Sequence, residues 1–345
     1  MRFTRCIALV LACLLTPSLG LAGQLVESGS TLLYPIMTAW AAAYDERYHD
    51  VSIATNATGS GTGISEATSG AATLGASDAY LTDAQQTADL LNIPLAISGQ
   101  HIAYNVAGLE SEHVRLTADV LAQIYSGKVT LWSDPAIAVL NPSLQSRLPK
   151  ETIVPLRRSD SSGDTFLFTE FLTRAAPTQW APKSGSRIAW PNVPGEAATK
   201  GNRELVQLCG AIKNSIAYIG ISYLEQTRSA HLGIAALRNR AGKFVTPEAD
   251  ALAAAAAHVG TIPKDGRVSL IDASGDGTYP IANVAYGIVK AHGHNPETLK
   301  DLRGFLTWIV DPADGNARGQ LDPVHLAPLT ESLRAYSRAQ IAAVR

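Results

Sequence analysis

Short β-rich runs alternate with helical patterns along this chain, an order that is typical of α/β proteins. The run VSIAT at residues 51–55 predicts one strand, and TIVPLRR at 152–158 predicts another. After the pair Tyr34-Pro35, large apolar side chains recur at four-residue spacing, which predicts an amphipathic helix that begins at a proline. These side chains are Ile36, Trp40 and Tyr44. The alternation therefore predicts an α/β fold.

The remaining elements follow the same pattern. A strand is expected to end at Ser77 or Asp78, and Thr82 is expected to cap a further helix with an acidic residue in its first turn. The run TFLFTEFL predicts a helix, residues 246–248 introduce an alanine-rich helix that ends before Gly260, and YPIANVAYGIVK predicts a return strand. No repeat and no polar linker marks a domain boundary, so a second domain would be joined by more than one crossing of the chain.

The N-terminus predicts an exported protein. Arg2 and Arg5 precede an apolar run that ends in small residues near Ala22, which is the layout of a secretory signal peptide over residues 1–22. A buried N-terminal helix is the alternative. Lipid attachment at Cys13 is less favoured, because the apolar stretch continues well past it. We therefore expect a periplasmic protein, cleaved near Ala22, without a lipid anchor.

Composition restricts the function further. The 345 residues are 46% hydrophobic, enough for a full core and about two domains. The net charge of −2 becomes more negative when the two arginines leave with the signal, which argues against nucleic acid as a partner.

Cys209 is the one cysteine beyond the signal and fits a small buried apolar residue. The histidines show no convincing ligand spacing, so we expect neither a metal nor a cofactor.

Three loops carry the chemistry: SGST at 28–31, TGSGTG at 58–63 and SDSSGDT at 159–165. Each precedes a predicted helix, whose first N–H groups and partial positive charge attract an anion. Glycine allows close approach, and Ser or Thr adds a hydroxyl donor. One such loop is ordinary capping, but three, the last preceded by Arg158, predict a site for a tetrahedral anion. No Gly-Lys-Ser/Thr follows, which disfavours a nucleotide triphosphatase, whereas TGSGTG leaves a serine hydrolase open.

In this order, the loops resemble those of the phosphate-binding proteins of high-affinity phosphate ABC transporters, the PstS family. The resemblance rests on GSTLLYPIMTAWAAAY, GSGTGISEA, GASDAYLT and RRSDSSGDTFLFTEFL and covers nearly the whole chain beyond residue 22. It implies the type II periplasmic binding-protein fold, with a hinge and a ligand cleft between two lobes. The first lobe would comprise residues 24–103 and 279–345, and the second would comprise 104–278.

The resemblance also implies individual roles. Phosphate would be held by Thr31, Leu32 through its main chain, Ser60, Asp78, Arg158, Ser162 and Gly163. Ser30 and Thr165 would lie around these residues, and Asp160 would pair with Arg158. An ionised Asp78 can only accept a hydrogen bond, so it would require a proton on the ligand, which phosphate has at neutral pH and sulfate lacks.

Asp164 departs from the family pattern, which places a threonine donor at this position. Its carboxylate is expected to cap the N–H groups of the following helix. The alternative is that Asp164 contacts the ligand and needs a second ligand proton, which would weaken binding as the pH rises.

The family resemblance implies a non-enzymatic, monomeric receptor that captures inorganic phosphate and delivers it to the permease subunits of an ABC transporter. Two alternatives stay open. One is a receptor for arsenate, sulfate or a phosphonate, and the other is a secreted phosphoester hydrolase that uses a serine of these loops.

Overall fold

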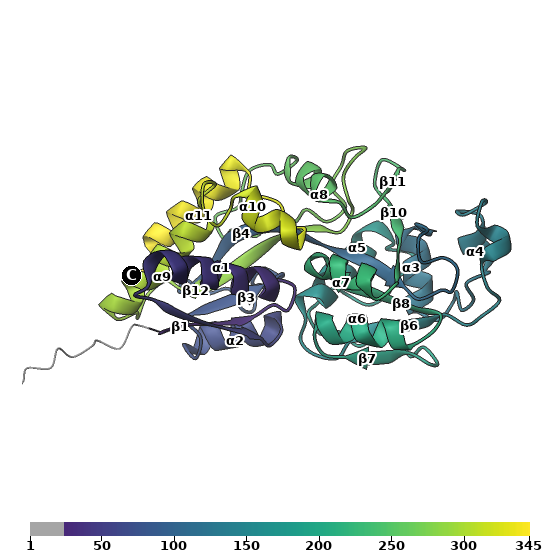
Figure 1. The fold of residues 1–345 in the computed structure, drawn as a ribbon, viewed down its shortest axis with the longest axis horizontal. Helices are drawn as coiled ribbons and strands as arrows, with labels where there is room; N and C mark the ends of the chain where they lie inside the picture. Colours follow the sequence, from purple (N-terminus) through teal and green to yellow (C-terminus); the bar gives the residue numbers. More distant parts are fainter. Residues whose placement is uncertain (1–23) are drawn as a thin grey trace, which may run out of the picture.

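The computed structural model describes residues 24–345, so the predicted signal peptide and Cys13 lie outside the described residues. Two α/β lobes lie side by side, and the long strand β4 runs from one to the other (Figure 1). Within the described residues, none of the helices combines the length and the apolar character that crossing a bilayer requires.

The sheet of the first lobe is built from strands that are far apart in the sequence. β1 (Gln24–Gly29) lies between β2 (Ser52–Ala57) and β3 (Leu74–Ser77), and all three run parallel. The return strand β12 (Ala282–Lys290) pairs antiparallel with β3 and with β4 (Leu90–Tyr104). The helices that follow the first two strands are α1 (Tyr34–Tyr48) and α2 (Ser60–Ser69).

β4 belongs to both lobes. Its residues 90–99 pair with β12, and its last residues, 100–104, pair with β8 (Ser215–Gly220) of the second lobe. Beyond β8 lie β6 (Val154–Arg158) and β7 (Ala197–Thr199), both parallel to their neighbour. The strand order is therefore β2-β1-β3-β12-β4-β8-β6-β7, with the change of lobe inside β4.

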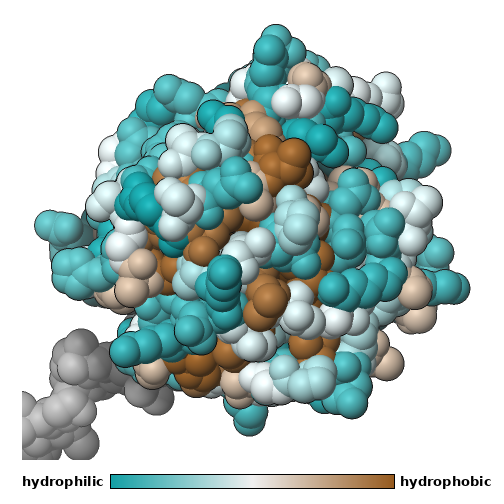
Figure 2. All heavy atoms as spheres, turned by 90° about the vertical axis from the view of Figure 1, so that its right-hand side faces the viewer, coloured by the Kyte–Doolittle hydropathy of each residue, from teal (hydrophilic) through white to brown (hydrophobic). Residues whose placement is uncertain are grey.

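The second lobe packs helices and a small sheet around β6 and β8. The helices are α3 (Ala118–Tyr125), α4 (Pro135–Ala138), α5 (Gly163–Ala175), α6 (Asn202–Ala211) and α7 (Leu224–Ser229). The short strands are β5 (Arg115–Leu116), β9 (Gly233–Ile234), β10 (Ala236–Arg238) and β11 (Phe244–Val245). Figure 2 shows the end of this lobe, where small apolar patches lie among hydrophilic side chains. Leu131 and Val139 are its exposed large apolar residues within the part of the chain described.

The strands and helices expected from the sequence are confirmed, with one exception. Residues 83–85 form a turn instead of the helix expected after Thr82. The side-chain oxygen of Gln85 accepts hydrogen bonds from both the backbone nitrogen and the hydroxyl of Thr82, at 3.0 and 2.9 Å. This local closure competes with helix formation, and the chain enters β4 only a few residues later.

The segment 249–278, which the sequence analysis assigned to the second lobe, contacts both lobes. Its last residues meet the second lobe, where Asn239 Nδ2 donates to the carbonyls of Gly275, Asp276 and Thr278 at 3.1, 2.9 and 3.1 Å. Its helix α8 (Ala249–Ala256) lies against β4 and β12, and the hydroxyl of Tyr286 in β12 bonds both main-chain groups of Val268. The C-terminal helices complete the first lobe: α9 (Pro296–Ile309), α10 (Arg318–Leu321) and α11 (Glu331–Ala343).

Glu27 is a carboxyl group inside the first lobe. It pairs in register with Thr55 of β2 and Leu74 of β3, so its side chain lies on the face of the sheet that α1 covers. Its residue is 1% exposed, and the Oε2 atom has no hydrogen-bond partner among the described residues. Burial raises the pKa of Glu27 to about 8, against a weaker opposing effect of the Asn56 main chain.

Because the folded-state pKa of Glu27 lies above its ordinary value, the folded chain holds a proton that the unfolded chain releases between about pH 4.5 and 8. The free energy of unfolding therefore falls as the pH rises through this window, by up to about 5 kcal/mol. We expect Glu27→Gln to match the wild type near pH 5 and to be the more stable protein at pH 9, as measured by urea unfolding. Glu46→Gln, at an exposed position of α1, is the control; a parallel pH dependence of Glu27→Gln and wild type would contradict the assignment.

Candidate functional site

The first lobe contributes a buried carboxylate held by two serines. Asp78 directly follows β3 and is 1% exposed. Its Oδ1 atom accepts a hydrogen bond from Ser30 Oγ at 2.6 Å, and its Oδ2 atom accepts one from Ser60 Oγ at 3.2 Å. The Asn283 amide holds the carbonyl of Asp78 at 2.6 Å. Two of the predicted loops thus meet at one acceptor group.

The second lobe contributes a buried cation. Arg158 is the last residue of β6 and is 2% exposed. Its Nε donates to Asp160 Oδ1 at 2.7 Å, its Nη2 donates to the other oxygen of Asp160, and its Nη1 donates to Asp164 Oδ2 at 2.7 Å. The expected pairing of Asp160 with Arg158 is therefore present in the structure. Charge-assisted contacts of this kind fix the guanidinium plane.

Asp164 does not cap the helix that follows it, contrary to the expectation from its position. Ser162 is the N-cap of α5, and its hydroxyl accepts from the backbone nitrogen of Thr165 at 3.3 Å. The Asp164 carboxylate instead accepts from Arg158, from Asn202 Nδ2 at 2.7 Å and from Gln100 Nε2 at 3.3 Å. A cationic donor is a stronger partner than a main-chain N–H group, so the ion pair decides where this carboxylate points.

The two carboxylates lie close enough to affect each other. Burial and then the charge of Asp164 raise the pKa of Asp78 to about 7, although the two serines and Arg158 act in the opposite direction. Burial also raises the pKa of Asp164, against the lowering effect of Arg158 and of its amide partners. Two neighbouring acids of this kind titrate as a pair and readily share one proton.

The loops from the two lobes are in direct contact. Gly61 N donates to the carbonyl of Ser161 at 3.0 Å across the lobe boundary. A Cβ atom on Gly163 would lie 2.4 Å from Ser60 Oγ and 2.5 Å from Asp78 Oδ2, so only glycine fits between the lobes here. All three predicted loops therefore converge, with the N-termini of α2 and α5 facing each other.

The other residues expected in the site lie on its border. Thr31 is 5% exposed, and its hydroxyl accepts from Asn202 Nδ2 at 2.9 Å. The carbonyl of Leu32 accepts from Ser222 Oγ at 2.5 Å. Thr165 points into the second lobe, where its hydroxyl lies 2.9 Å from that of Tyr218.

Sequence reasoning missed Asn202, Gln100 and Tyr218. Asn202 follows Gly201 and opens α6, so it shares the glycine-before-helix pattern of the other loops but lacks their Ser or Thr. Tyr218 accepts from the backbone nitrogen of Arg158 at 2.9 Å and lies in an apolar strand, as Gln100 also does. Nothing in the local sequence distinguishes these two residues from core positions.

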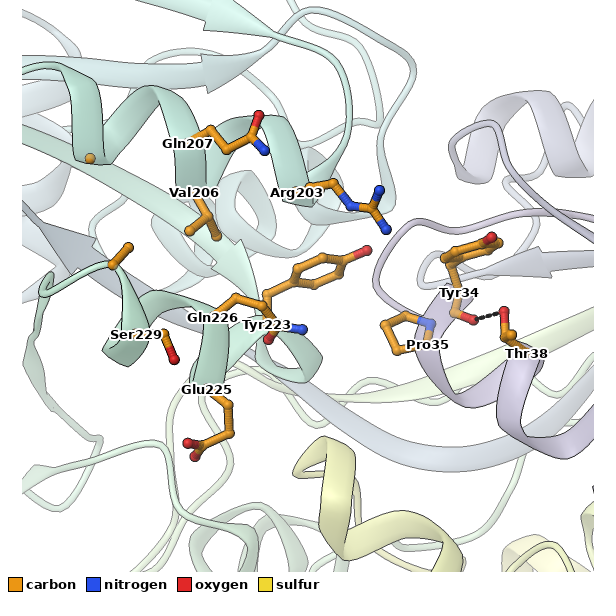
Figure 3. Close-up of a pocket in the computed structure, with 12 residues that line it drawn as sticks. Tyr34, Pro35, Thr38, Arg203, Val206, Gln207, Tyr223, Glu225, Gln226 and Ser229 are labelled. Atoms are coloured by element: carbon orange, nitrogen blue, oxygen red, sulfur yellow. Dashed lines mark hydrogen bonds between the residues drawn. The ribbon is translucent and has the colours of Figure 1, made fainter.

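A cleft leads from the surface to this cluster. Its volume is about 740 Å³, and Thr31, Asn202 and Asp160 lie in its wall. A neighbouring groove of about 950 Å³ is lined by both lobes (Figure 3). In that view, Tyr34 and Pro35 of α1 lie across from Tyr223 and Arg203 of the second lobe. Both hollows therefore have walls that come from both lobes.

Comparison with known proteins places this chain in a family. Residues 16–313 match the model of the PBP superfamily domain. The phosphate-binding protein PstS of Xylella fastidiosa is 31% identical over 310 residues, which cover 89% of this chain and 81% of that protein. The PstS protein of Methanocaldococcus jannaschii is also 31% identical, over 322 residues, 87% of this chain and 80% of the relative.

Solved structures show the same fold. The phosphate-binding protein from Stenotrophomonas maltophilia superimposes with a TM-score of 0.68 at 22% identity, covering 92% of this chain and 94% of the other. A putative phosphate transporter substrate-binding protein from Clostridium perfringens gives a TM-score of 0.65 at 19% identity, covering 89% and 100%. The two-lobe architecture is therefore shared with proteins that are 19% and 22% identical to this chain in sequence.

Proposed function

The chain belongs to the PstS family of phosphate-binding proteins within the PBP superfamily, and we propose that it captures inorganic phosphate between its lobes for delivery to an ABC permease. The observation that carries the proposal is the placement of Arg158 from one lobe and Asp78 from the other around the N-termini of α2 and α5. The activity is binding and release, so the protein is not an enzyme.

The proposed contacts divide into donors and acceptors. Arg158 supplies the cation, and the hydroxyls of Thr31 and Ser162 donate to phosphate oxygens together with the main-chain N–H groups of Leu32 and Gly163. The hydroxyl of Ser60, which donates to Asp78 Oδ2 at 3.2 Å, turns its hydrogen to the phosphate when the anion binds. Buried donors that lose water without gaining a partner cost about 1–3 kcal/mol each, so a small tetrahedral anion that engages all of them is strongly preferred. Asp78 accepts the proton that remains on phosphate.

Phosphate binding is proposed to close the lobes about β4. Residues 90–99 of this strand belong to one sheet and 100–104 to the other, so bending near residue 100 separates the donors of the two lobes. We propose that the boundary of the second lobe lies before α8, because this helix lies against β4 and β12. The closed form is the one that a permease recognises, and the receptor acts in the periplasm as a monomer.

The hydroxyl contacts of the serines fit a receptor better than a hydrolase. Ser60 Oγ donates to Asp78, and Ser162 Oγ accepts from Thr165 N, so both are engaged in holding the loops. A nucleophilic serine requires a hydrogen bond to a general base such as histidine. The buried His101 contacts Thr227 Oγ1, at 2.9 Å, in the second lobe.

Titration calorimetry with phosphate tests the proposal and the role of Asp164 together. Since burial and the charge of Asp164 raise the pKa of Asp78 to about 7, raising the pH from 5.5 to 8 adds a negative charge to the Asp78–Asp164 pair while phosphate itself becomes a dianion. We expect wild-type affinity to fall by about tenfold over this range and Asp164→Thr to remove most of that change.

Asp119→Thr is the matched control, because Asp119 is also the second residue of its helix, α3, in the same lobe. It should keep the wild-type pH profile. Absence of phosphate binding by the wild type at either pH would overturn the proposed function. An unchanged profile in Asp164→Thr would instead exclude Asp164 as a cause of the pH dependence.

A further inference from the structure

Asn202 joins groups of both lobes. It is the first residue of α6 and is fully buried. Its Nδ2 donates to Thr31 Oγ1 of the first lobe at 2.9 Å and to Asp164 Oδ2 of the second lobe at 2.7 Å. Its Oδ1 accepts from the backbone nitrogen of Gly220, at the end of β8, at 2.9 Å. Every polar atom of the carboxamide is thus engaged.

The Gly220 contact determines which way the carboxamide faces. A backbone N–H can only donate, so the carbonyl oxygen of Asn202 must face it and the amino group must face Thr31 and Asp164. The Thr31 hydroxyl accepts from Asn202 and keeps its single hydrogen for another acceptor. Asp164, which also binds Arg158, is held against the cation by the second N–H of the same amide.

We propose that Asn202 is a positioning residue that latches the lobes around the bound anion, an inference that rests on the proposed phosphate receptor. The latch has two effects. It turns the Thr31 hydroxyl hydrogen toward the phosphate, and it ties Thr31 to the Arg158–Asp164 pair of the other lobe. Opening the lobes must break the Thr31 contact, so the latch slows phosphate release.

The surroundings of Asn202 support this role. Thr31 and Asn202 both line the 740 Å³ cleft, so their contact lies where the site meets the surface. Gly201 adopts a φ of 73°, and a Cβ atom there would lie 2.5 Å from Glu204 Oε2. This glycine turns the chain so that the first residue of α6 points inward instead of capping its own helix.

The test is Asn202→Asp, which preserves shape but removes both N–H donors and sets a carboxylate beside Asp164. Phosphate affinity and the dissociation rate, the latter by stopped flow, would be measured at pH 5 and pH 8 and compared with the wild type at the same pH. We expect release about 100-fold faster than wild type at pH 8. At pH 5 the introduced acid is protonated and regains one donor, so the difference should shrink to about tenfold.

Asn192→Asp, an exposed position in the same lobe, is the control for added charge and should release phosphate at the wild-type rate. A loss through misfolding would lower the melting temperature and would not recover at pH 5. If Asn202→Asp does not fold, Asn202→Ala and Thr31→Val form a double-mutant cycle. The phosphate affinity of the double variant should then lie within about threefold of that of the single variant with the lower affinity.

The outcomes separate the two proposals. The latch would be overturned if the wild type binds phosphate tightly and Asn202→Asp releases it at the wild-type rate. Additive effects in the double-mutant cycle would also overturn it. Either result would leave the proposed receptor intact. Absence of phosphate binding by the wild type would overturn the receptor, and the latch would fall with it.

Discussion

Replacing Arg158 by alanine is expected to weaken phosphate binding by roughly 10³-fold or more. Arg158 is the cation that the site places between Asp160 and Asp164, and its side chain is 1% exposed. Without it, the buried carboxylate of Asp164, the partly buried carboxylate of Asp160 and an anion would share a space that water reaches poorly. Calorimetric titration at pH 7 should give no detectable heat at phosphate concentrations that saturate the wild type.

Two further variants separate charge from geometry. Arg158→Lys keeps the charge but cannot reproduce the two parallel contacts with Asp160, so intermediate affinity is expected. Arg157→Ala removes the neighbouring arginine, whose half-buried side chain pairs with Glu196 at 2.8 Å. That variant should stay within about threefold of the wild type, because partly exposed ion pairs contribute little. Near-native affinity in a folded Arg158→Ala protein would refute the assigned site.

The converging loops could be predicted from the sequence because each has a local pattern. Ser, Thr and Gly before a helix mark the N-termini that bind anions, and Arg158 stands next to the last loop. Their order along the chain then identified the family. A strand that serves both lobes has no such pattern: Leu90–Tyr104 is simply a long apolar run, and its change of partner at residue 100 depends on tertiary packing.

One interpretation failed where a local rule competed with a distant partner. At Asp164 the capping rule predicted a contact with N–H groups of its own helix, but Arg158, Asn202 and Gln100 supply stronger donors from other elements. The segment 249–278 carries no mark of the lobe it joins, because its apolar side chains could pack on either sheet. Asn202 was missed for a related reason, since its partners lie 171 and 38 residues away.

Asp78→Asn is expected to remove most of the preference for phosphate over sulfate. An ionised Asp78 offers only acceptors, so it repels sulfate, which carries no proton, but accepts the proton of phosphate. Asparagine in the same place donates an N–H to either anion. Sites that demand one hydrogen bond discriminate by about 10⁴ or more, so we expect the ratio of the two affinities to fall by at least about 10³-fold, mostly through gained sulfate binding.

The raised pKa of Asp78, about 7, adds a pH signature to this prediction. Below pH 7 the protonated acid can itself donate to sulfate, so wild-type sulfate affinity should rise with falling pH, whereas Asp78→Asn should bind sulfate equally well at pH 5.5 and pH 8. Competition titrations with both anions would measure this. Asp160→Asn is the control for lost charge: its carboxylate accepts hydrogen bonds from Arg158, so affinity should fall while the phosphate preference remains. If Asp78→Asn keeps the preference for phosphate over sulfate, Asp164, the other buried carboxylate of the site, would be the residue that discriminates between the two anions.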